Sequence, residues 1–160
     1  MISKFFTPTL SFNLILLFSF SISVNTFVEI QTVNYLFYIL FHLSFIYFLF
    51  YHYHYSIYFI GLFYGILLDI FLLNEISSHL LSLILLISIY ILVKKYLLLL
   101  SVYQINLTIF LTLITVLSLE GIFAYLFNNI IFSITQILMY LIISLIIFIP
   151  SMFIFNKLDK

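Results

Sequence analysis

The sequence predicts an all-α integral membrane protein, a bundle of about six transmembrane helices with both termini on the cytoplasmic side. Of its 160 residues, 66% are hydrophobic and only 6% are charged, whereas soluble domains carry roughly a quarter of their residues as Asp, Glu, Lys and Arg. Disorder is excluded as well, because disordered chains are poor in apolar residues. The formal net charge is zero, so the chain lacks the basic surface that holds nucleic acid phosphates, and we expect no nucleic acid partner.

Long intervals with few charges set the number of helices. A transmembrane helix needs about 20 apolar residues to cross a hydrocarbon core about 30 Å thick. A single helix over residues 34–73 would be about 60 Å long, so the chain must turn back within this interval. The polar cluster at residues 51–54 is the expected turn. In the last long interval Asn128-Asn129 supplies the turn, because Asn tolerates left-handed backbone angles.

The predicted helices follow in order from these breaks. Runs such as 80–93 lack the polar–apolar alternation of strands in transmembrane barrels, which favours helices throughout. Together they form one polytopic membrane domain over residues 1–160. The expected helices span residues 8–24, 33–50, 55–73, 79–93, 97–119 and 130–155.

Lysine positions predict the orientation, because Lys and Arg accumulate in cytoplasmic loops. Six crossings place Lys4, Lys94, Lys95, Lys157 and Lys160 on one side of the membrane. Five crossings would separate the first of these from the last two. We therefore expect an even number of helices and cytoplasmic termini.

The first apolar segment has an alternative interpretation as a cleaved signal peptide. Lys4 would be its charged region, residues 10–20 its apolar core and residues 21–23 its cleavage site. Cleavage would leave an odd number of helices and divide the lysines between the two sides. The transmembrane interpretation is therefore favoured.

Gly61, Gly65 and Asp69 share one face of the third predicted helix at a spacing of four residues. Two glycines at this spacing let a neighbouring helix approach closely. An ionisable group costs about 2.5–3.5 kcal/mol at the centre of a span and normally faces protein or water. Asp69 either reaches the outer headgroups or caps the turn at Asn74, or it forms a buried interhelical hydrogen bond that fixes the fold or a partner surface. Proton or substrate coupling is a third alternative.

Two further polar residues are expected near Asp69. His79 opens the fourth predicted helix, and Glu120 closes the fifth on the same side. An Asp69–His79 pair is plausible across the short connection, and the three side chains could bind a cation. Polar residues at helix ends are more often interfacial, so we expect no metal. His42, in the middle of the second helix, is expected to be a hydrogen-bonded structural histidine rather than a proton relay.

Catalytic motifs are absent from the sequence. There is no Ser-x-x-Lys, Gly-x-Ser-x-Gly or His-Glu-x-x-His, and three glycines are too few for a phosphate-binding loop. Without cysteine there is no thiolate nucleophile or zinc–thiolate site. We expect neither enzymatic activity nor a cofactor.

The segment from Tyr58 to Tyr96 resembles the rod shape-determining protein MreD family. The similarity lies in an apolar helix carrying Gly61, Gly65 and Asp69, a short outer loop, a further apolar helix and the basic end Lys94-Lys95. Members of this family are small bacterial inner-membrane proteins of similar length. The resemblance thus implies a multi-pass protein of the bacterial inner (plasma) membrane.

It also implies a non-enzymatic scaffold in the cell-elongation complex, which positions peptidoglycan synthesis. The expected partners are the lipid bilayer, MreC-like and MreB-like proteins and the peptidoglycan synthases. A competing function is the substrate-binding membrane subunit of a small-molecule (vitamin) importer, in which Asp69, His79, Glu120 and Gln136 would converge on one outward pocket. The third alternative is a subunit that stabilises an unrelated membrane complex.

Overall fold

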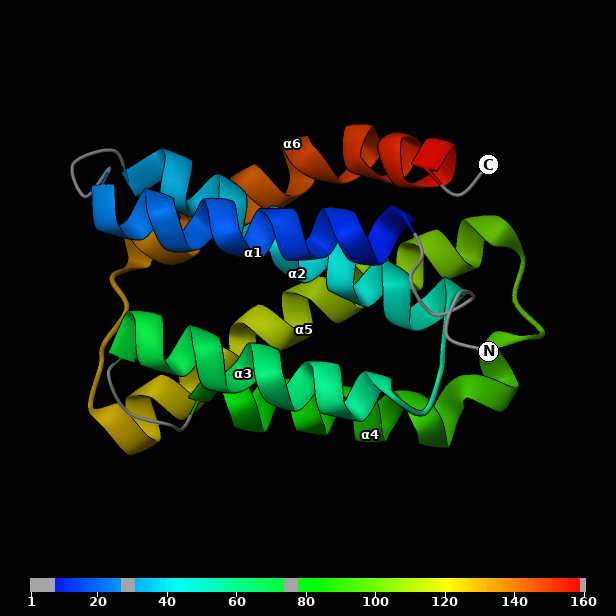
Figure 1. Ribbon diagram of the computed structural model, residues 1–160, viewed down its shortest axis with the longest axis horizontal. Coiled ribbons are helices and arrows are strands. Elements are labelled where there is room, and N and C mark those ends of the chain that lie inside the picture. The colour runs from blue at the N-terminus through cyan, green and yellow to red at the C-terminus, as the bar shows by residue number, and fades with distance from the viewer. Residues whose placement is uncertain (1–7, 27–30, 74–77, 159–160) are drawn as a thin grey trace. The chain divides into compact units, whose positions relative to one another are not determined.

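The computed structural model describes residues 8–26, 31–73 and 78–158, and these residues form helices and turns without any strand. The predicted all-α, membrane-type class is confirmed (Figure 1). The six helices in the described residues are α1 (Pro8–Thr26), α2 (Gln31–Tyr51), α3 (Ile57–Leu73), α4 (Ser78–Leu97), α5 (Val102–Asn128) and α6 (Ile134–Leu158).

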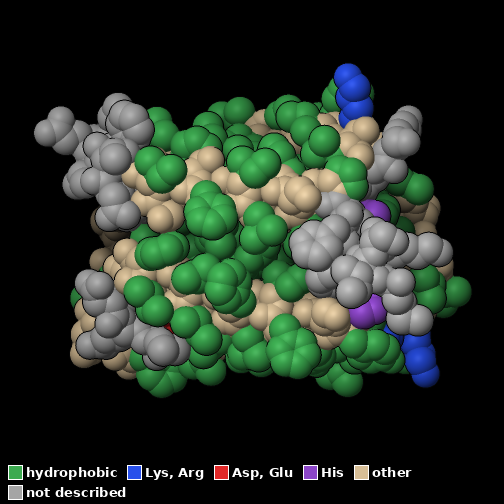
Figure 2. Space-filling model, viewed as in Figure 1, with side chains coloured by type: hydrophobic (Ala, Val, Ile, Leu, Met, Phe, Trp, Pro, Cys, Tyr) green, Lys and Arg blue, Asp and Glu red, His purple; other side chains and the backbone are tan. Residues whose placement is uncertain are grey.

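Helix length and composition fit an integral membrane protein. Within the described residues, four helices are long and apolar enough to cross a membrane, at residues 32–51, 78–97, 102–128 and 134–158. The other two, α1 and α3, are apolar but shorter. The 17 residues of α3 extend about 26 Å at ~1.5 Å per residue, at the lower limit for a span. Figure 2 shows hydrophobic side chains spread over the visible surface of the protein, as contact with lipid requires.

The helix boundaries agree with the prediction in the first half of the chain. α2 ends at Tyr51 and α3 begins at Ile57, so the turn lies where the sequence placed it. α3 also ends at the predicted residue, Leu73. Lys4, Asn74 and Lys160 lie outside the described residues.

Several predicted boundaries in the second half are wrong. α5 and α6 begin at Val102 and Ile134 rather than at residues 97 and 130. α4 does not stop at Val93 but continues through Lys94-Lys95 to Leu97, because cations are favourable in the last turn of a helix. α5 does not end at Leu119 but continues to Asn128, because Glu120 is buried inside the helix rather than lying at its end.

Hydrogen bonds at both ends of α5 explain its limits. At the start, Ser101 Oγ accepts from Gln104 N, and Gln104 Oε1 accepts from Ser101 N, which forms a capping box. At the end, Asn129 has left-handed backbone angles, φ 54° and ψ 28°, as the Asn128-Asn129 pair predicted. Its amide donates to Tyr125 O at 3.2 Å.

The chain folds into two compact units. Unit 1 contains residues 1–52 and 133–160, and unit 2 contains residues 53–132. The single membrane domain expected over residues 1–160 and the cytoplasmic position of both termini stay predictions. Each unit has its own helix contacts and its own buried polar groups.

In unit 1, α2 packs against both α1 and α6. The rings of Phe12 on α1 and Phe155 on α6 lie 6.0 Å apart at one end. The rings of Tyr35 on α2 and Tyr140 on α6 lie 4.7 Å apart at the other end. The central histidine, His42, is fully buried, and its Nδ1 lies 2.8 Å from Tyr38 O. The predicted hydrogen bond of His42 is therefore present, and its structural role stays a prediction.

A buried asparagine ties α1 to α2. Asn13 is fully buried, and its Nδ2 donates to Phe41 O at 3.0 Å and to Ser44 Oγ. Ser44 Oγ in turn donates to Phe41 O at 3.0 Å. Interhelical hydrogen bonds of this kind stabilise membrane bundles by roughly 0.6–2 kcal/mol each.

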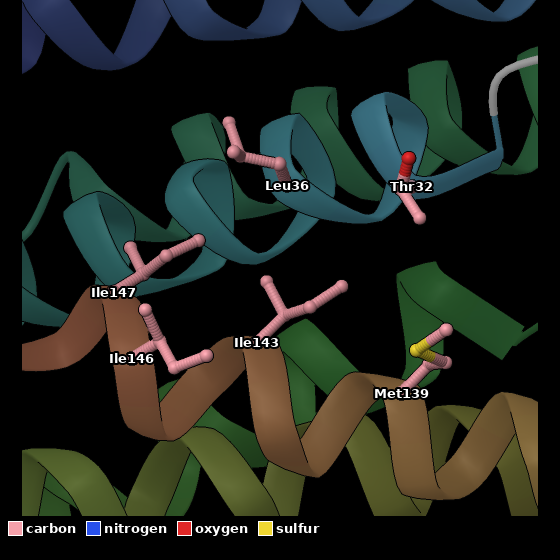
Figure 3. A pocket seen from close by; sticks show the side chains of 6 residues that line it. All are labelled: Thr32, Leu36, Met139, Ile143, Ile146 and Ile147. Carbon is pink, nitrogen blue, oxygen red and sulfur yellow. The ribbon is translucent and has the colours of Figure 1, made fainter.

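An open apolar groove of about 240 Å³ lies between α2 and α6 (Figure 3). Thr32 is the only polar residue of its lining. In a membrane, acyl chains or another apolar helix would fill such a groove. The lining residues are Thr32, Leu36, Met139, Ile143, Ile146 and Ile147.

The left-handed cap at Asn129 makes a testable prediction. Asn129→Gly should keep the stability of the protein, because Gly adopts positive φ without a Cβ penalty. Asn129→Val should destabilise it by about 1–2 kcal/mol, the cost of this conformation for a residue with a Cβ. Hydrogen exchange of the last turn of α5 in detergent micelles would measure the effect. Equal protection in both variants would contradict it.

Candidate functional site

The helix hairpin of α3 and α4 in unit 2 is built on a close backbone contact at Gly65. A Cβ atom on this residue would lie 2.5 Å from Leu80 Cα and 3.0 Å from Leu80 N. Real side chains do not tolerate the first distance, and the atoms met are backbone atoms that cannot turn away. Gly61, one turn earlier, is also buried. Gly65 thus serves close packing against α4, while the part that Gly61 plays in this packing stays a prediction.

Asp69 lies one turn after Gly65 and caps the start of α4. Its side chain is fully buried. Oδ1 accepts from His79 N at 2.9 Å and from His79 Nδ1 at 2.7 Å, and Oδ2 accepts from Leu80 N at 3.1 Å. The first amides of a helix have no partner within that helix, and a carboxylate is favourable at its positive end. Asp69 is therefore an N-cap supplied by a neighbouring helix.

These contacts bear on two of the alternatives for Asp69, whereas the cap of the turn at Asn74 lies outside the described residues and proton or substrate coupling stays untested. Because it is fully buried, it does not extend to the headgroups. Its hydrogen bonds cross from α3 to α4, which is the interhelical bond that the sequence offered as an alternative. Since a carboxylate oxygen only accepts, His79 Nδ1 carries the proton in their 2.7 Å contact.

Ser82 and Glu120 extend this polar contact to α5. Ser82 lies one turn after His79 on α4, and its Oγ is 3.0 Å from His79 O and 3.2 Å from Glu120 Oε1. Glu120 is 4% exposed and belongs to the buried face of α5. We call Asp69, His79, Ser82 and Glu120 the polar network of unit 2. It connects three helices through buried side chains.

The sequence pattern predicted three members of the network, Asp69, His79 and Glu120, but not Ser82. Its spacing could have predicted Ser82, because a residue three positions after His79 on a helix lies on the same face. The cation site considered for Asp69, His79 and Glu120 does not form: in the part of the chain that the structure describes, no three His, Asp or Glu side chains are placed to hold a metal ion.

Gln136, the fourth residue considered for an importer pocket, belongs to unit 1. There its Oε1 accepts from Ser133 N at 2.9 Å, and its own amide donates to Ser133 Oγ at 3.3 Å. This is a capping box at the start of α6. Gln136 thus has a local structural use.

The opposite end of unit 2 holds an aromatic cluster around Lys94. Its Nζ lies 4.4 Å from the ring centroid of Tyr53 and 5.8 Å from that of Tyr55. The rings of Tyr53 and Tyr90 are 5.4 Å apart. Burial, and to a lesser extent the phenols of Tyr55 and Tyr58, raise the pKa of Tyr53, so it stays neutral at physiological pH. Tyrosine rings with a lysine are typical of a membrane–water interface.

Comparisons of the chain with models of protein families, with curated proteins and with solved structures find no match. The residues that bear on function are therefore those of the α3–α4 hairpin and of the polar network of unit 2. Gly65 and Asp69 of the hairpin and the members of the network are buried, and the network is bonded internally. Their arrangement fixes helices against one another.

The contact at Gly65 predicts different effects of the same substitution at two glycines. Gly65→Ala should destabilise the protein by about 1–3 kcal/mol, the usual cost of overpacking, because α3 and α4 must move apart. Gly121→Ala is the matched control, since its new Cβ would meet only Phe132 side-chain atoms at 3.8 Å or more. Denaturant unfolding in detergent would compare them. Equal stability of the two variants would refute the packing role of Gly65.

The N-cap role predicts a graded series at Asp69. Asp69→Ala should destabilise most, because it leaves the buried amide of His79 and the part-buried amide of Leu80 without an acceptor, at about 1–3 kcal/mol for each group that is left unsatisfied. Asp69→Asn should lie between Ala and the wild type, because one amide oxygen can replace one of the two carboxylate oxygens. Hydrogen exchange at His79 N and Leu80 N, together with unfolding, would check this order. An Ala variant as stable as the wild type would show that the cap is dispensable.

Proposed function

We propose that this protein is a scaffold component of the bacterial cell-elongation complex, an MreD-like protein of the inner membrane. The observation that carries the proposal is the construction of the hairpin from Tyr58 to Tyr96. Three of the residues on which the resemblance depends, Gly61, Gly65 and Asp69, lie buried on α3, and Gly65 and Asp69 contact the first turn of α4.

A scaffold in the membrane needs helices held at fixed relative positions. The backbone contact at Gly65 sets the separation of α3 and α4, and the cap from Asp69 sets their register. The contact between Ser82 and Glu120 extends this order to α5. These interactions make unit 2 a rigid support for other membrane helices.

The exposed face of α4 supplies a surface for such helices. Its members recur at intervals of three and four residues, which places them in one line along the helix. Helices associate in lipid mainly by packing complementary shapes, so an MreC-like partner that crosses the membrane would pack on such a line. The exposed residues of this face are Leu81, Leu85, Ile89 and Leu92.

Orientation follows from the lysines under the same proposal. Lys94 and Lys95 lie in the last turn of α4, and Lys157 lies in the last turn of α6. Because lysines accumulate on the cytoplasmic side, both helices would end in the cytoplasm. The polar network of unit 2 would then lie toward the periplasm, and the aromatic cluster around Lys94 toward the MreB-like filament.

The importer alternative requires polar side chains that line a pocket open to a substrate. Asp69, His79 and Glu120 are instead buried, with exposed fractions of 0%, 5% and 4%. They are bonded to backbone groups and to Ser82. This internal use favours the scaffold over the importer.

Partner capture tests the proposed function. A tagged chain extracted in mild detergent from its own host should retain an MreC-like protein and peptidoglycan synthases. Gly65→Ala should reduce the recovered partner several-fold, roughly in proportion to a loss of 1 kcal/mol or more in packing, whereas Gly121→Ala should not. Quantitative mass spectrometry gives the readout. Recovery of an ATPase module with bound vitamin would replace the scaffold by the importer.

A further inference from the structure

The end of α4 in unit 2 carries two positive charges that are remote from the described carboxylates. Lys94 and Lys95 lie in its last turn. The carboxylates among the described residues of this unit, Asp69 and Glu120, bond to the first two turns of the helix, the latter at Ser82. From Ser82 to Lys94 an α-helix rises about 18 Å. This exceeds the screening length of about 8 Å at physiological salt, so neither carboxylate balances the two lysines.

Two tyrosine rings fix the position of one of these ammonium groups. Lys94 Nζ lies 4.4 Å from the ring centroid of Tyr53 and 5.8 Å from that of Tyr55. The two rings meet edge to face, with their centroids 5.8 Å apart. Aromatic rings attract a cation through their quadrupole but carry no charge that would neutralise it. Because an ammonium group has three N–H donors, Lys94 is a positioned cation that can still bind an anion.

A second donor lies next to this cation. The hydroxyl of Tyr53 is buried, and no group of the described residues forms a hydrogen bond with it, although buried polar atoms normally have a partner. The residue belongs to the turn between α2 and α3, and its side chain as a whole is part-exposed. A phenol and an ammonium group both donate to an acceptor, so the complementary ligand is an anion with several oxygen atoms.

The surface around the two lysines indicates where this anion comes from. Leu92 is 74% exposed, and Leu98 and Leu99, which follow α4, are 86% and 83% exposed. Acyl chains would cover these side chains, whereas a phosphate ion free in water would not. Lysine and tyrosine at the end of an apolar helix lie at the depth of the lipid headgroups. The molecule that offers anionic oxygens and acyl chains together at this depth is a phospholipid.

We propose that this end of unit 2 is a binding site for the phosphate of an anionic phospholipid, held by the ammonium group of Lys94 and the hydroxyl of Tyr53. A small rotation of the Tyr53 side chain turns its hydroxyl to the phosphate. Lys95, which is exposed, adds a general attraction to negatively charged headgroups. A zwitterionic lipid binds more weakly, because its own cationic group is repelled by two lysines. The site does not depend on which proteins the chain binds in the membrane.

Native mass spectrometry of the full chain in detergent, titrated with phosphatidylglycerol or phosphatidylcholine, measures this binding. Phosphatidylglycerol should bind roughly tenfold more tightly or better. Lys94→Gln should weaken its binding about fiftyfold, because a charge-assisted hydrogen bond is lost together with the general attraction. Lys95→Gln is the matched control with the same change of charge, and it should cost only about fivefold. Equal losses in the two variants, or equal binding of the two lipids, would overturn the proposal.

The hydroxyl of Tyr53 is tested without a change of charge. Tyr53→Phe keeps the ring next to Lys94 and should weaken phosphatidylglycerol binding about fivefold, the size of one hydrogen bond. Tyr55→Phe, the control, should bind as the wild type does. A Tyr53→Phe variant with unchanged affinity would overturn the assigned site. Glycerol phosphate, which has the same phosphate without acyl chains, should not compete, and competition at equal concentration would overturn the lipid as its occupant.

Discussion

The contact between Asp69 and the first turn of α4 is the interaction on which unit 2 depends. A helix that begins inside a membrane has amide groups without partners and no water to satisfy them. Asp69 accepts from two of these amides, at His79 and Leu80. It reaches them only because Gly65, one turn earlier, lets the backbones of α3 and α4 touch at Leu80. Gly65 and Asp69 therefore act together. Gly65 brings the two helices close enough for the carboxylate of Asp69 to reach α4, and this carboxylate bonds the amides that the close contact buries.

Much of this arrangement was predictable from the sequence, because it follows from the cost of polar groups in lipid. The helical class, the turn before Ile57 and the left-handed angles at Asn129 all come from local composition. The meeting of Asp69 with His79 comes from their positions on either side of a short connection. In each case a polar residue among many apolar ones indicated the structural feature.

The wrongly predicted helix boundaries have a physical reason too. Charged residues in an apolar sequence predict helix ends, yet Lys94 extends from the last turn of α4 over aromatic rings, and Glu120 is buried in α5, where it contacts Ser82. The capping box of Ser101 and Gln104 was a visible signal for the true start of α5. The division into two units had no sequence signal, because helices that are apolar on every side do not show which face meets another helix.

Polar side chains that form hydrogen bonds within a unit are not presented to other membrane helices. Ser44 and Ser82 each connect a backbone carbonyl of their own helix to a side chain of the next helix. Because these polar groups bind within the units, the surface that α4 offers consists of apolar side chains such as Leu85 and Ile89. In lipid, apolar contact carries no hydrophobic driving force, so specificity must come from the fit of one rigid surface to another. If the protein is the proposed scaffold, a rigid hairpin is a requirement for selecting partners, and the buried contacts of Gly65 and Asp69 would control assembly.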